Sequence, residues 1–202
     1  QMSPPTANAE RKLNSTLFLH SGGSTICSTH RTSANSPAAS PSSAVPPKNA
    51  ASAPAARQLP AKDCGVIERY TRGFNYPEQS QVKTKGDLPR LGIKTYFCSN
   101  VCAVYRRGRY LELGGFIRRT IFNEDMIFAA KAIQAGYSVL YAADAKVIHS
   151  HNYSPMEQFR RNFDLAVSQK DHPEVFSGLR SEGEGIRLVK ETAGYLIRSG
   201  RG

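Results

Sequence analysis

Long hydrophobic runs are missing from this chain of 202 residues, of which 40% are hydrophobic. A membrane-spanning helix needs about 20 consecutive apolar residues, and no stretch approaches that length. Near the N-terminus, Leu17-Phe18-Leu19 follows Arg11 and Lys12 but is too short for the core of a signal peptide. We therefore expect one globular domain in the cytoplasm, either soluble or attached peripherally at the inner face of the plasma membrane.

Cysteine is scarce as well. The four cysteines form neither a Cys-x-x-Cys pair nor the regular spacing of a disulfide scaffold. We therefore expect reduced and mostly buried thiols at Cys27, Cys64, Cys98 and Cys102. A zinc site that joins the last two cysteines to His149 and His151 has suitable residue types, although its spacing matches none of the common zinc patterns.

Acidic residues are the minority charge, with 16 Asp and Glu against 27 Lys and Arg and a net charge of +11. A basic chain suits nucleic acid, anionic lipid or a phosphorylated substrate, and composition does not choose among these partners. The basic residues are scattered, whereas single-stranded nucleic acid is bound by a basic groove interleaved with aromatic side chains. We expect most of them on the solvated surface.

The chain divides by composition near Arg57. Residues 31–56 are dominated by Ala, Ser and Pro, which offer almost no large apolar side chains to offset the entropy of ordering. The preceding residues are interrupted by Ser21-Gly22-Gly23-Ser24. We expect residues 1–56 to be disordered and residues 57–202 to form the folded domain.

Several elements of that domain follow from local patterns. Residues 95–105 are rich in β-branched and aromatic side chains, which predicts a buried strand. A short helical turn then ends at Gly114-Gly115. Asn123 is placed to cap a helix that buries Ile127, Ala130 and Ile133 and that ends before Gly136.

The C-terminal part alternates strands and helices. Residues 138–141 and 146–148 read as short strands. Ser154-Pro155-Met156-Glu157 is a capping box with proline at the first helical position, so a helix begins there. Its stripe of Met156, Phe159, Phe163 and Ala166 predicts a core-facing side, with Arg161 and Asp164 pointing outward. The amphipathic segment 186–197 either caps the fold or lies on a membrane surface.

Two groups of residues have a chemical interpretation. Glu124 and Asp125 lie in the first turn of a predicted helix, where the helix dipole alone explains acidic residues. His149 and His151 are two apart at the end of a strand, so their side chains project to one side. They suit a shared ligand or metal, and they equally suit two surface histidines.

The order of these pieces is more specific than any one of them. They are Ser99-Asn100 with Ala103 and Arg106-Arg107, Leu113-Gly114-Gly115-Phe116, Asn123-Glu124-Asp125, Ala135-Gly136-Tyr137 and Val147-Ile148-His149. This order resembles the second half of the family-2 glycosyltransferases of GT-A fold, from about Arg57 to at least Phe176. Bacterial rhamnosyltransferase-type enzymes are the most similar members, because they contain stretches similar to residues 74–77, 93–100 and 149–154. The resemblance implies an α/β chain: a partial GT-A, Rossmann-like nucleotide-diphospho-sugar transferase domain with a mixed sheet and flanking helices.

The resemblance also implies roles for individual residues. Asp125 matches the catalytic base of an inverting transfer to a saccharide or lipid-linked acceptor, and Glu124 orients the acceptor or holds the loop. The donor is a nucleotide-diphospho-sugar, and Mg²⁺ or Mn²⁺ bridges its diphosphate, with His149 and then His151 as expected ligands. A reference pKa of about 3.9 suffices for Asp125 without a large shift. The resemblance places the substrate-binding residues at Asn100, Gly114, Gly115, Phe116, Arg160 and Arg161.

The chain also departs from this family. The expected nucleotide-binding half, which ends in an Asp-x-Asp metal motif, has no counterpart upstream of Arg57. A reading-frame change or a truncation would explain this, and the resemblance then implies weak or no transfer by this chain. Two other functions stay open. One is a non-catalytic basic module that binds nucleic acid or anionic lipid, and the other is a regulatory remnant that pairs with an intact homologue.

Overall fold

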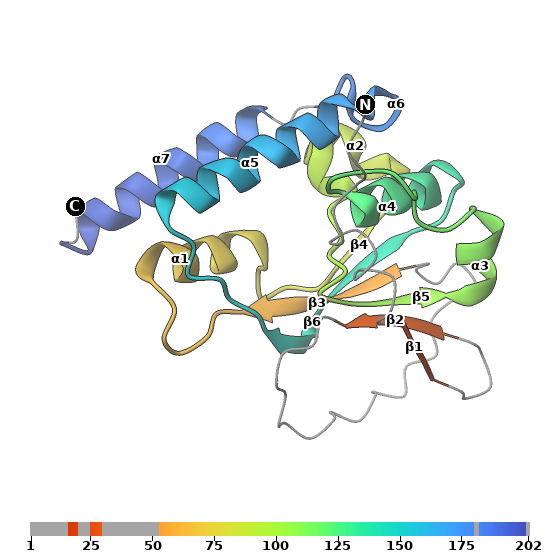
Figure 1. Ribbon diagram of the computed structural model, residues 1–202, viewed down its shortest axis with the longest axis horizontal. Coiled ribbons are helices and arrows are strands. Elements are labelled where there is room, and N and C mark those ends of the chain that lie inside the picture. Colours follow the sequence, from red (N-terminus) through yellow and green to blue (C-terminus); the bar gives the residue numbers. More distant parts are fainter. Residues whose placement is uncertain (1–15, 20–24, 30–52, 180–181, 201–202) are drawn as a thin grey trace, which may run out of the picture.

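A computed structural model describes residues 16–19, 25–29, 53–179 and 182–200 of the chain. Its strands form one mixed sheet of six strands in the order β1-β2-β5-β3-β6-β4. Figure 1 shows most of the helices gathered on one side of this sheet. The expected α/β class with a mixed sheet and flanking helices is thereby confirmed. The predicted disorder of residues 1–56 stays a prediction, because most of that segment lies outside the described residues.

The centre of the sheet is β3 (Ala53–Leu59), whose small side chains Ala53, Ala55 and Ala56 are buried. It pairs in parallel with β6 (Val139–Ile148) and in antiparallel with β5 (Cys102–Arg106). The outer strands are β1 (Thr16–Leu19), β2 (Thr25–Thr29) and β4 (Gln81–Lys83). Because β3 runs through residue 57, the sheet includes residues that composition assigns to the low-complexity segment.

Strand β6 replaces the two short strands expected at 138–141 and 146–148. Ala142 pairs with Ala56 and Lys146 pairs with Arg57, so residues 143–145 form a bulge within one strand. A bulge bends a strand without ending it. It interrupts the strand pattern in the sequence, so the pattern predicted two separate strands.

The prediction of a buried strand over residues 95–105 was wrong for residues 95–101, because the strand begins at Cys102. The 3₁₀ helix η3 (Gly92–Thr95) and a turn lead into β5, although Tyr96 and Cys98 are buried as the apolar pattern requires. A side chain satisfies carbonyls of this segment, since the buried Lys83 donates to the carbonyls of Lys94, at 3.2 Å, and of Phe97. The segment is therefore core without being part of the sheet.

The helix expected after Asn123 is α4 (Glu124–Gln134), and Ile127, Ala130 and Ile133 are buried as expected. Gly136 follows its end with a φ of 86°. The capping mode differs from the expectation, because Asn123 is left-handed with a φ of 67° and makes no side-chain cap. Its amide instead donates to the carbonyl of Leu165 at 3.4 Å, which ties α4 to α5.

Helix α5 (Pro155–Lys170) begins with the predicted capping box, in which the Ser154 hydroxyl and the Glu157 carboxylate each bond the other residue's backbone N–H. The predicted direction of its apolar stripe was wrong. Met156, Phe159 and Phe163 are 57%, 65% and 60% exposed, and Ala166 is exposed as well.

The inward face of α5 is polar instead. The guanidinium of Arg161, which was expected to point outward, lies 4.9 Å from the centre of the Phe122 ring. Ser168 is buried and donates to the carbonyl of Phe122 at 2.6 Å. A cation over an aromatic face and a satisfied buried hydroxyl thus replace the expected apolar contact.

The described residues form six further helices. They are α1 (Val66–Asn75), η2 (Lys85–Asp87), α2 (Leu88–Leu91), α3 (Arg107–Glu112), α6 (Pro173–Phe176) and α7 (Glu182–Arg198). Helix α7 is the amphipathic segment expected near the C-terminus, and it packs on α1 through stacked Tyr70 and Tyr195 rings. Within the described residues, none of these helices combines the length and apolarity required to cross a membrane. Cys64 and Cys98 are free, buried thiols, as expected, whereas the Cys27 side chain lies outside the described part of the chain.

Candidate active site

Asp125 lies in the first turn of α4, with its carboxylate held by two backbone N–H groups. Asn100 donates to Oδ2 at 3.1 Å, and Met126 donates to Oδ1 at 2.8 Å. Burial and the charge of Glu124 raise the pKa of Asp125 to about 7, and the two N–H donors oppose this rise. A carboxylate with this pKa takes up a proton near neutral pH, although the expected role as a base does not require a large shift.

Asn100 connects both acids to the core. Its side-chain amide lies 3.5 Å from Oε1 of Glu124, while its backbone N–H bonds Asp125. The hydroxyl of Tyr105, which is fully buried on β5, donates to the amide oxygen of Asn100. The predicted site residues Asn100, Glu124 and Asp125 thus lie together, although Asn100 is 24 and 25 positions away from the two acids in the chain.

A polar chain continues from this site through the neighbouring residue. The hydroxyl of Ser99 accepts from Nε2 of Gln58 at 2.7 Å, and Gln58 on β3 is only 2% exposed. The amide oxygen of Gln58 in turn accepts from the guanidinium of Arg72 on α1. Both the NH₂ group and the oxygen of this buried amide are hydrogen-bonded. Breaking either bond would leave a desolvated polar group, so Gln58 holds Ser99 and Arg72 in position.

The chain then reaches the histidines. Arg72 Nε donates to Oε1 of Glu68 at 2.7 Å, one turn earlier on α1. The same carboxylate oxygen accepts the backbone N–H of His151 at 3.3 Å. Hydrogen bonds and one peptide link therefore run from Asp125 through Asn100-Ser99, Gln58, Arg72 and Glu68 to His151.

His149 and His151 face each other beyond the end of β6. Their Nε2 atoms lie 2.8 Å apart, and their rings meet edge to face with centroids 4.4 Å apart. The backbone N–H of His149 donates to the carbonyl of Leu59 at 3.0 Å, and the ring of His151 stacks on Tyr153 with centroids 4.9 Å apart. The expectation that both side chains project to one side is confirmed.

This separation can be compared with the geometry of a metal ion. The two Nε2 atoms are at hydrogen-bond distance from each other. Two cis ligands about 2.1 Å from an octahedral ion would lie about 3 Å apart, so the spacing of the pair is also compatible with one edge of such a site. The part of the chain that the structure describes contains no group of three or more His, Cys, Asp or Glu side chains around one point. The alternative zinc site with Cys98 and Cys102 is therefore not formed there, and the described residues contribute a histidine pair.

Two known proteins match this chain over most of its length. The chain is 49% identical over 146 residues to the O-antigen chain rhamnosyltransferase RfbN of Salmonella typhimurium, and 44% identical over 146 residues to the O-antigen chain rhamnosyltransferase WbaN of Salmonella anatum. The chain is similar to bacterial rhamnosyltransferases. Each match covers 71% of this chain and 46% of the relative, so the chain spans less than half the length of these relatives. The chain matches no family model and no solved structure.

The glycine-rich turn of this rhamnosyltransferase-like chain has a clear structural role. Gly114 and Gly115 end α3 with φ values of 77° and 65°, and the N–H of Gly115 donates to the carbonyl of Tyr110 at 2.8 Å. Phe116 packs edge-on against Tyr105, with ring centroids 5.2 Å apart. The turn thereby supports the residue that bonds Asn100, while substrate contact by these three residues stays a prediction.

The two arginines expected near the donor diphosphate differ in setting. Arg160 is exposed on α5, and Arg161 packs over Phe122, which directly precedes Asn123-Glu124-Asp125. Arg161 therefore lies beside the loop that carries the acids. Contact of either arginine with a diphosphate stays a prediction.

Four members of the polar chain were missed as site residues: Ser99, Gln58, Glu68 and Arg72. A signal for two of them was present, because Glu68 and Arg72 are four residues apart, the spacing of an ion pair along one helix face. Gln58 lies in the stretch Arg57-Gln58-Leu59-Pro60, where the resemblance to rhamnosyltransferases begins. Its partners are 14 and 41 positions away, so nothing local indicates them.

Proposed function

We propose that this chain carries the acceptor-side, base-bearing part of an inverting glycosyltransferase of family 2 with a GT-A fold. The reaction is the transfer of a sugar, rhamnose by similarity, from a nucleotide-diphospho-sugar to a saccharide or lipid-linked acceptor of a cell-surface polysaccharide. The observation that carries the proposal is Asp125, a carboxylate with a pKa raised to about 7 and held by the backbone of Asn100.

Asp125 serves as the general base. The acceptor hydroxyl oxygen forms a bond to the anomeric carbon while the bond from that carbon to the diphosphate breaks. The hydroxyl proton moves to Asp125, and the leaving electron pair remains on the diphosphate. A base with a pKa near the working pH combines a large ionised fraction with a useful driving force for this proton transfer.

Glu124 and Asn100 position this base. The carboxylate of Glu124 raises the pKa of Asp125, and Asn100 bridges the two acids. Glu124 is partly exposed, so it is also available to orient an acceptor hydroxyl.

A divalent ion, Mg²⁺ or Mn²⁺, stabilises negative charge on the leaving diphosphate when it is bound. His149 and His151 would hold it from this chain, and their spacing supports that assignment. Imidazole ligands favour Mn²⁺ over Mg²⁺, since Mg²⁺ prefers oxygen. The exposed Arg160 and the neighbouring Arg161 are suited to contact the diphosphate oxygens.

Peripheral contact with an anionic membrane belongs to the same proposal. The exposed stripe of Met156, Phe159 and Phe163 on α5 provides apolar side chains for insertion. Exposed basic residues on the same pair of helices, Arg160 on α5 with Lys190 and Arg198 on α7, complement lipid phosphates. A lipid-linked acceptor would then be presented at the surface where the enzyme is held.

The test is a transfer assay with radiolabelled nucleotide-diphospho-rhamnose, Mn²⁺ and acceptor lipid from bacterial membranes. Because the chain matches only 46% of its relatives' length, we expect wild-type transfer to be weak but measurable. Asp125→Asn should lower transfer by about 10²- to 10⁴-fold, the usual contribution of a general base. Asp144→Asn is the matched control, because Asp144 is exposed on β6, and it should leave transfer unchanged. The logarithm of the wild-type rate should rise with pH and level off near pH 7, as Asp125 ionises.

Equal transfer by wild type and Asp125→Asn would overturn the assignment of the base. The second candidate, a non-catalytic basic module, is favoured by the net charge of +11. Such a module would show no transfer, together with nucleic-acid binding that weakens steeply as salt rises. Acceptor binding through hydroxyl groups should change little with salt.

A further inference from the structure

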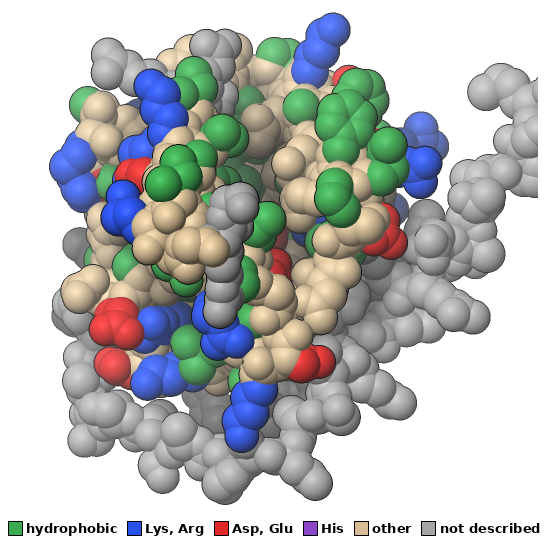
Figure 2. All heavy atoms as spheres, turned by 90° about the vertical axis from the view of Figure 1, so that its left-hand side faces the viewer, with side chains coloured by type: hydrophobic (Ala, Val, Ile, Leu, Met, Phe, Trp, Pro, Cys, Tyr) green, Lys and Arg blue, Asp and Glu red, His purple; other side chains and the backbone are tan. Residues whose placement is uncertain are grey.

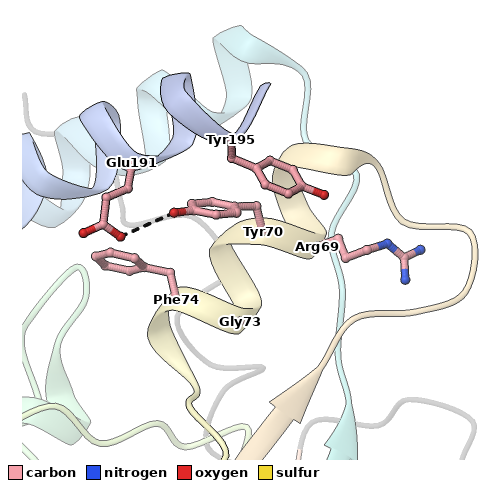
Figure 3. Close-up of a pocket in the computed structure, with 6 residues that line it drawn as sticks. All are labelled: Arg69, Tyr70, Gly73, Phe74, Glu191 and Tyr195. Carbon is pink, nitrogen blue, oxygen red and sulfur yellow. Dashed lines mark hydrogen bonds between the residues drawn. The ribbon is translucent and has the colours of Figure 1, made fainter. Parts of the chain in front are cut away.

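A cleft between α1 and α7 lies outside the polar chain that joins the acids to the histidines. It has a volume of about 350 Å³ and is lined by Arg69, Tyr70, Gly73, Phe74, Glu191 and Tyr195. Figure 3 shows the three aromatic rings facing the space between the two helices, with Glu191 at one end and Arg69 at the other. Figure 2 views the end of the molecule where α1 begins and α7 ends, and hydrophobic side chains are interspersed there with Lys and Arg.

The aromatic residues form a rigid wall. Tyr70 from α1 and Tyr195 from α7 stack with ring centroids 4.7 Å apart and an interplanar angle of 27°. Phe74 lies one turn after Tyr70, and its ring carries Lys94 and Arg187, each about 4.5 Å from the ring centre. These contacts hold the rings in place. Two cations already lie over Phe74, so the preorganised apolar surface is offered by the faces of Tyr70 and Tyr195 outside their stack.

The polar residues of the cleft keep capacity for a ligand. Glu191 accepts from the Tyr70 hydroxyl and from Arg187, each at 3.4 Å, which is long for a bond to a carboxylate. Arg69 is exposed and uses one nitrogen to donate to the carbonyl of Lys62 at 3.2 Å. A guanidinium has five N–H donors, so further donors remain, and Glu191 remains a strong acceptor.

Gly73 is exposed in the last turn of α1 and lines the cleft. Glycine weakens a helix relative to alanine, and its usual justifications are a positive φ or a crowded neighbour. Gly73 has neither, since its φ is not positive and an added Cβ would meet nothing within 4 Å. What the glycine does provide is an open floor, where a ligand can approach the helix backbone.

We propose that this cleft binds one pyranose ring of the saccharide acceptor. Aromatic faces pack against the C–H faces of a sugar, while a carboxylate and a guanidinium bond its hydroxyls. The carboxylate of Glu191 in the cleft disfavours a phosphate. This inference rests on the proposed function, because it takes the acceptor to be a saccharide.

The position of the cleft indicates which sugar unit it would hold. Helix α1 contributes Glu68 and Arg72 to the polar chain that reaches His151, and Tyr70 and Phe74 to the cleft. One helix therefore contacts both sites through different side chains. The cleft suits a unit remote from the reacting hydroxyl, so it would affect binding of the acceptor chain rather than the chemical step.

The test is saturation-transfer NMR of the purified chain, titrated with methyl rhamnopyranoside, methyl mannopyranoside and methyl galactopyranoside. Gly73→Leu should fill the cleft and raise the Kd of the preferred glycoside by about tenfold or more. The matched control is Gly185→Leu, a helical glycine on α7 that also has nothing within 4 Å of an added Cβ. It should bind as wild type does. Neither variant should unfold at a lower temperature, because leucine favours a helix over glycine.

Wild-type affinity in Gly73→Leu, or no saturable binding by the wild type, would overturn the inference. Asp125→Asn separates it from the proposed function, since this variant should lose transfer and keep glycoside binding. If Asp125→Asn retains transfer while Gly73→Leu loses binding, the cleft assignment holds and the catalytic assignment fails. If Asp125→Asn loses transfer while Gly73→Leu binds the glycoside as wild type does, the cleft assignment fails and the catalytic assignment holds.

Discussion

The backbone N–H of Asn100 donates to the carboxylate of Asp125 at 3.1 Å and joins the turn before β5 to the first turn of α4. This bond holds the half-buried acid that the proposed reaction requires. Because Asn100 also accepts from Tyr105, the position of the acid depends on the aromatic core beneath it.

Asp125 should make stability depend on pH. Its folded-state pKa of about 7 lies above the unfolded value of 3.8, so the folded state binds this proton more tightly. That contribution to stability is fully present below pH 3.8 and is lost as pH rises to about 7. The pKa shift corresponds to as much as about 4 kcal/mol of stability. The gain measured in Asp125→Asn should be smaller, because the asparagine side chain has only one oxygen to accept the two backbone N–H groups.

Thermal unfolding of wild type and Asp125→Asn at about pH 4 and pH 8 measures this effect. The variant should gain stability relative to wild type at the higher pH by several degrees more than at the lower pH. The exposed carboxylate of Asp144 provides the control, and Asp144→Asn should show no such difference. A constant offset for Asp125→Asn would contradict the raised pKa.

Gln58 should be costly to remove, because it bonds Ser99 and Arg72 in a buried position. Gln58→Ala leaves both partners short of a bond, and we expect a loss of about 1–3 kcal/mol in urea unfolding. Gln158 is an exposed glutamine on α5, so Gln158→Ala is the control. Its free energy of unfolding should stay within about 0.5 kcal/mol of the wild-type value. Similar values for the two variants would mean that the polar chain adds no stability.

Gly115 should tolerate substitution less well than Gly114. Both residues have positive φ, so alanine costs about 1–2 kcal/mol at either position. A Cβ on Gly115 would also lie 3.0 Å from the Tyr110 ring, whereas a Cβ on Gly114 would meet nothing within 4 Å. Chemical unfolding of the two alanine variants should therefore show the larger loss for Gly115→Ala, and the reverse order would be inconsistent with this turn.

The exposed stripe on α5 should bind membranes without stabilising the fold. Phe159→Ser with Phe163→Ser should change the free energy of unfolding by less than about 1 kcal/mol, because both rings are largely exposed. Binding to vesicles that contain anionic lipid should fall by about tenfold or more in a flotation assay.

Ala166→Ser, a small change at an exposed position of the same helix, is the control and should bind vesicles as wild type does. A loss of stability of about 3 kcal/mol or more in the double variant would mean that the stripe is packed as core. If wild type is a dimer that the double variant dissociates, the stripe is a protein interface and membrane contact is excluded as its role.

Features that depend on nearby residues were predictable. The capping box of Ser154 and Glu157 spans four residues, and Gly136 follows α4 with the positive φ that glycine adopts without cost. Side-chain alternation also placed His149 and His151 on one side, where the structure has their rings in contact. In each case the interacting groups are too close in sequence for the rest of the fold to separate them.

Features that depend on distant partners were not predictable. The strand expected from residue 95 gives way to a turn, because Lys83 and Asp125 satisfy its backbone in place of a neighbouring strand. The shifted pKa of Asp125 likewise follows from burial, which no local pattern reports.

The sequence by itself determined that α5 is an amphipathic helix, where it begins, and which residues share its faces. Only the tertiary structure decided which face turns inward. Phe122 presents both a ring for Arg161 and a carbonyl for Ser168, so the polar face of the helix finds satisfied partners and the aromatic face is left outside. Helical periodicity sets which side chains align, but burial is decided by the surface that each face meets.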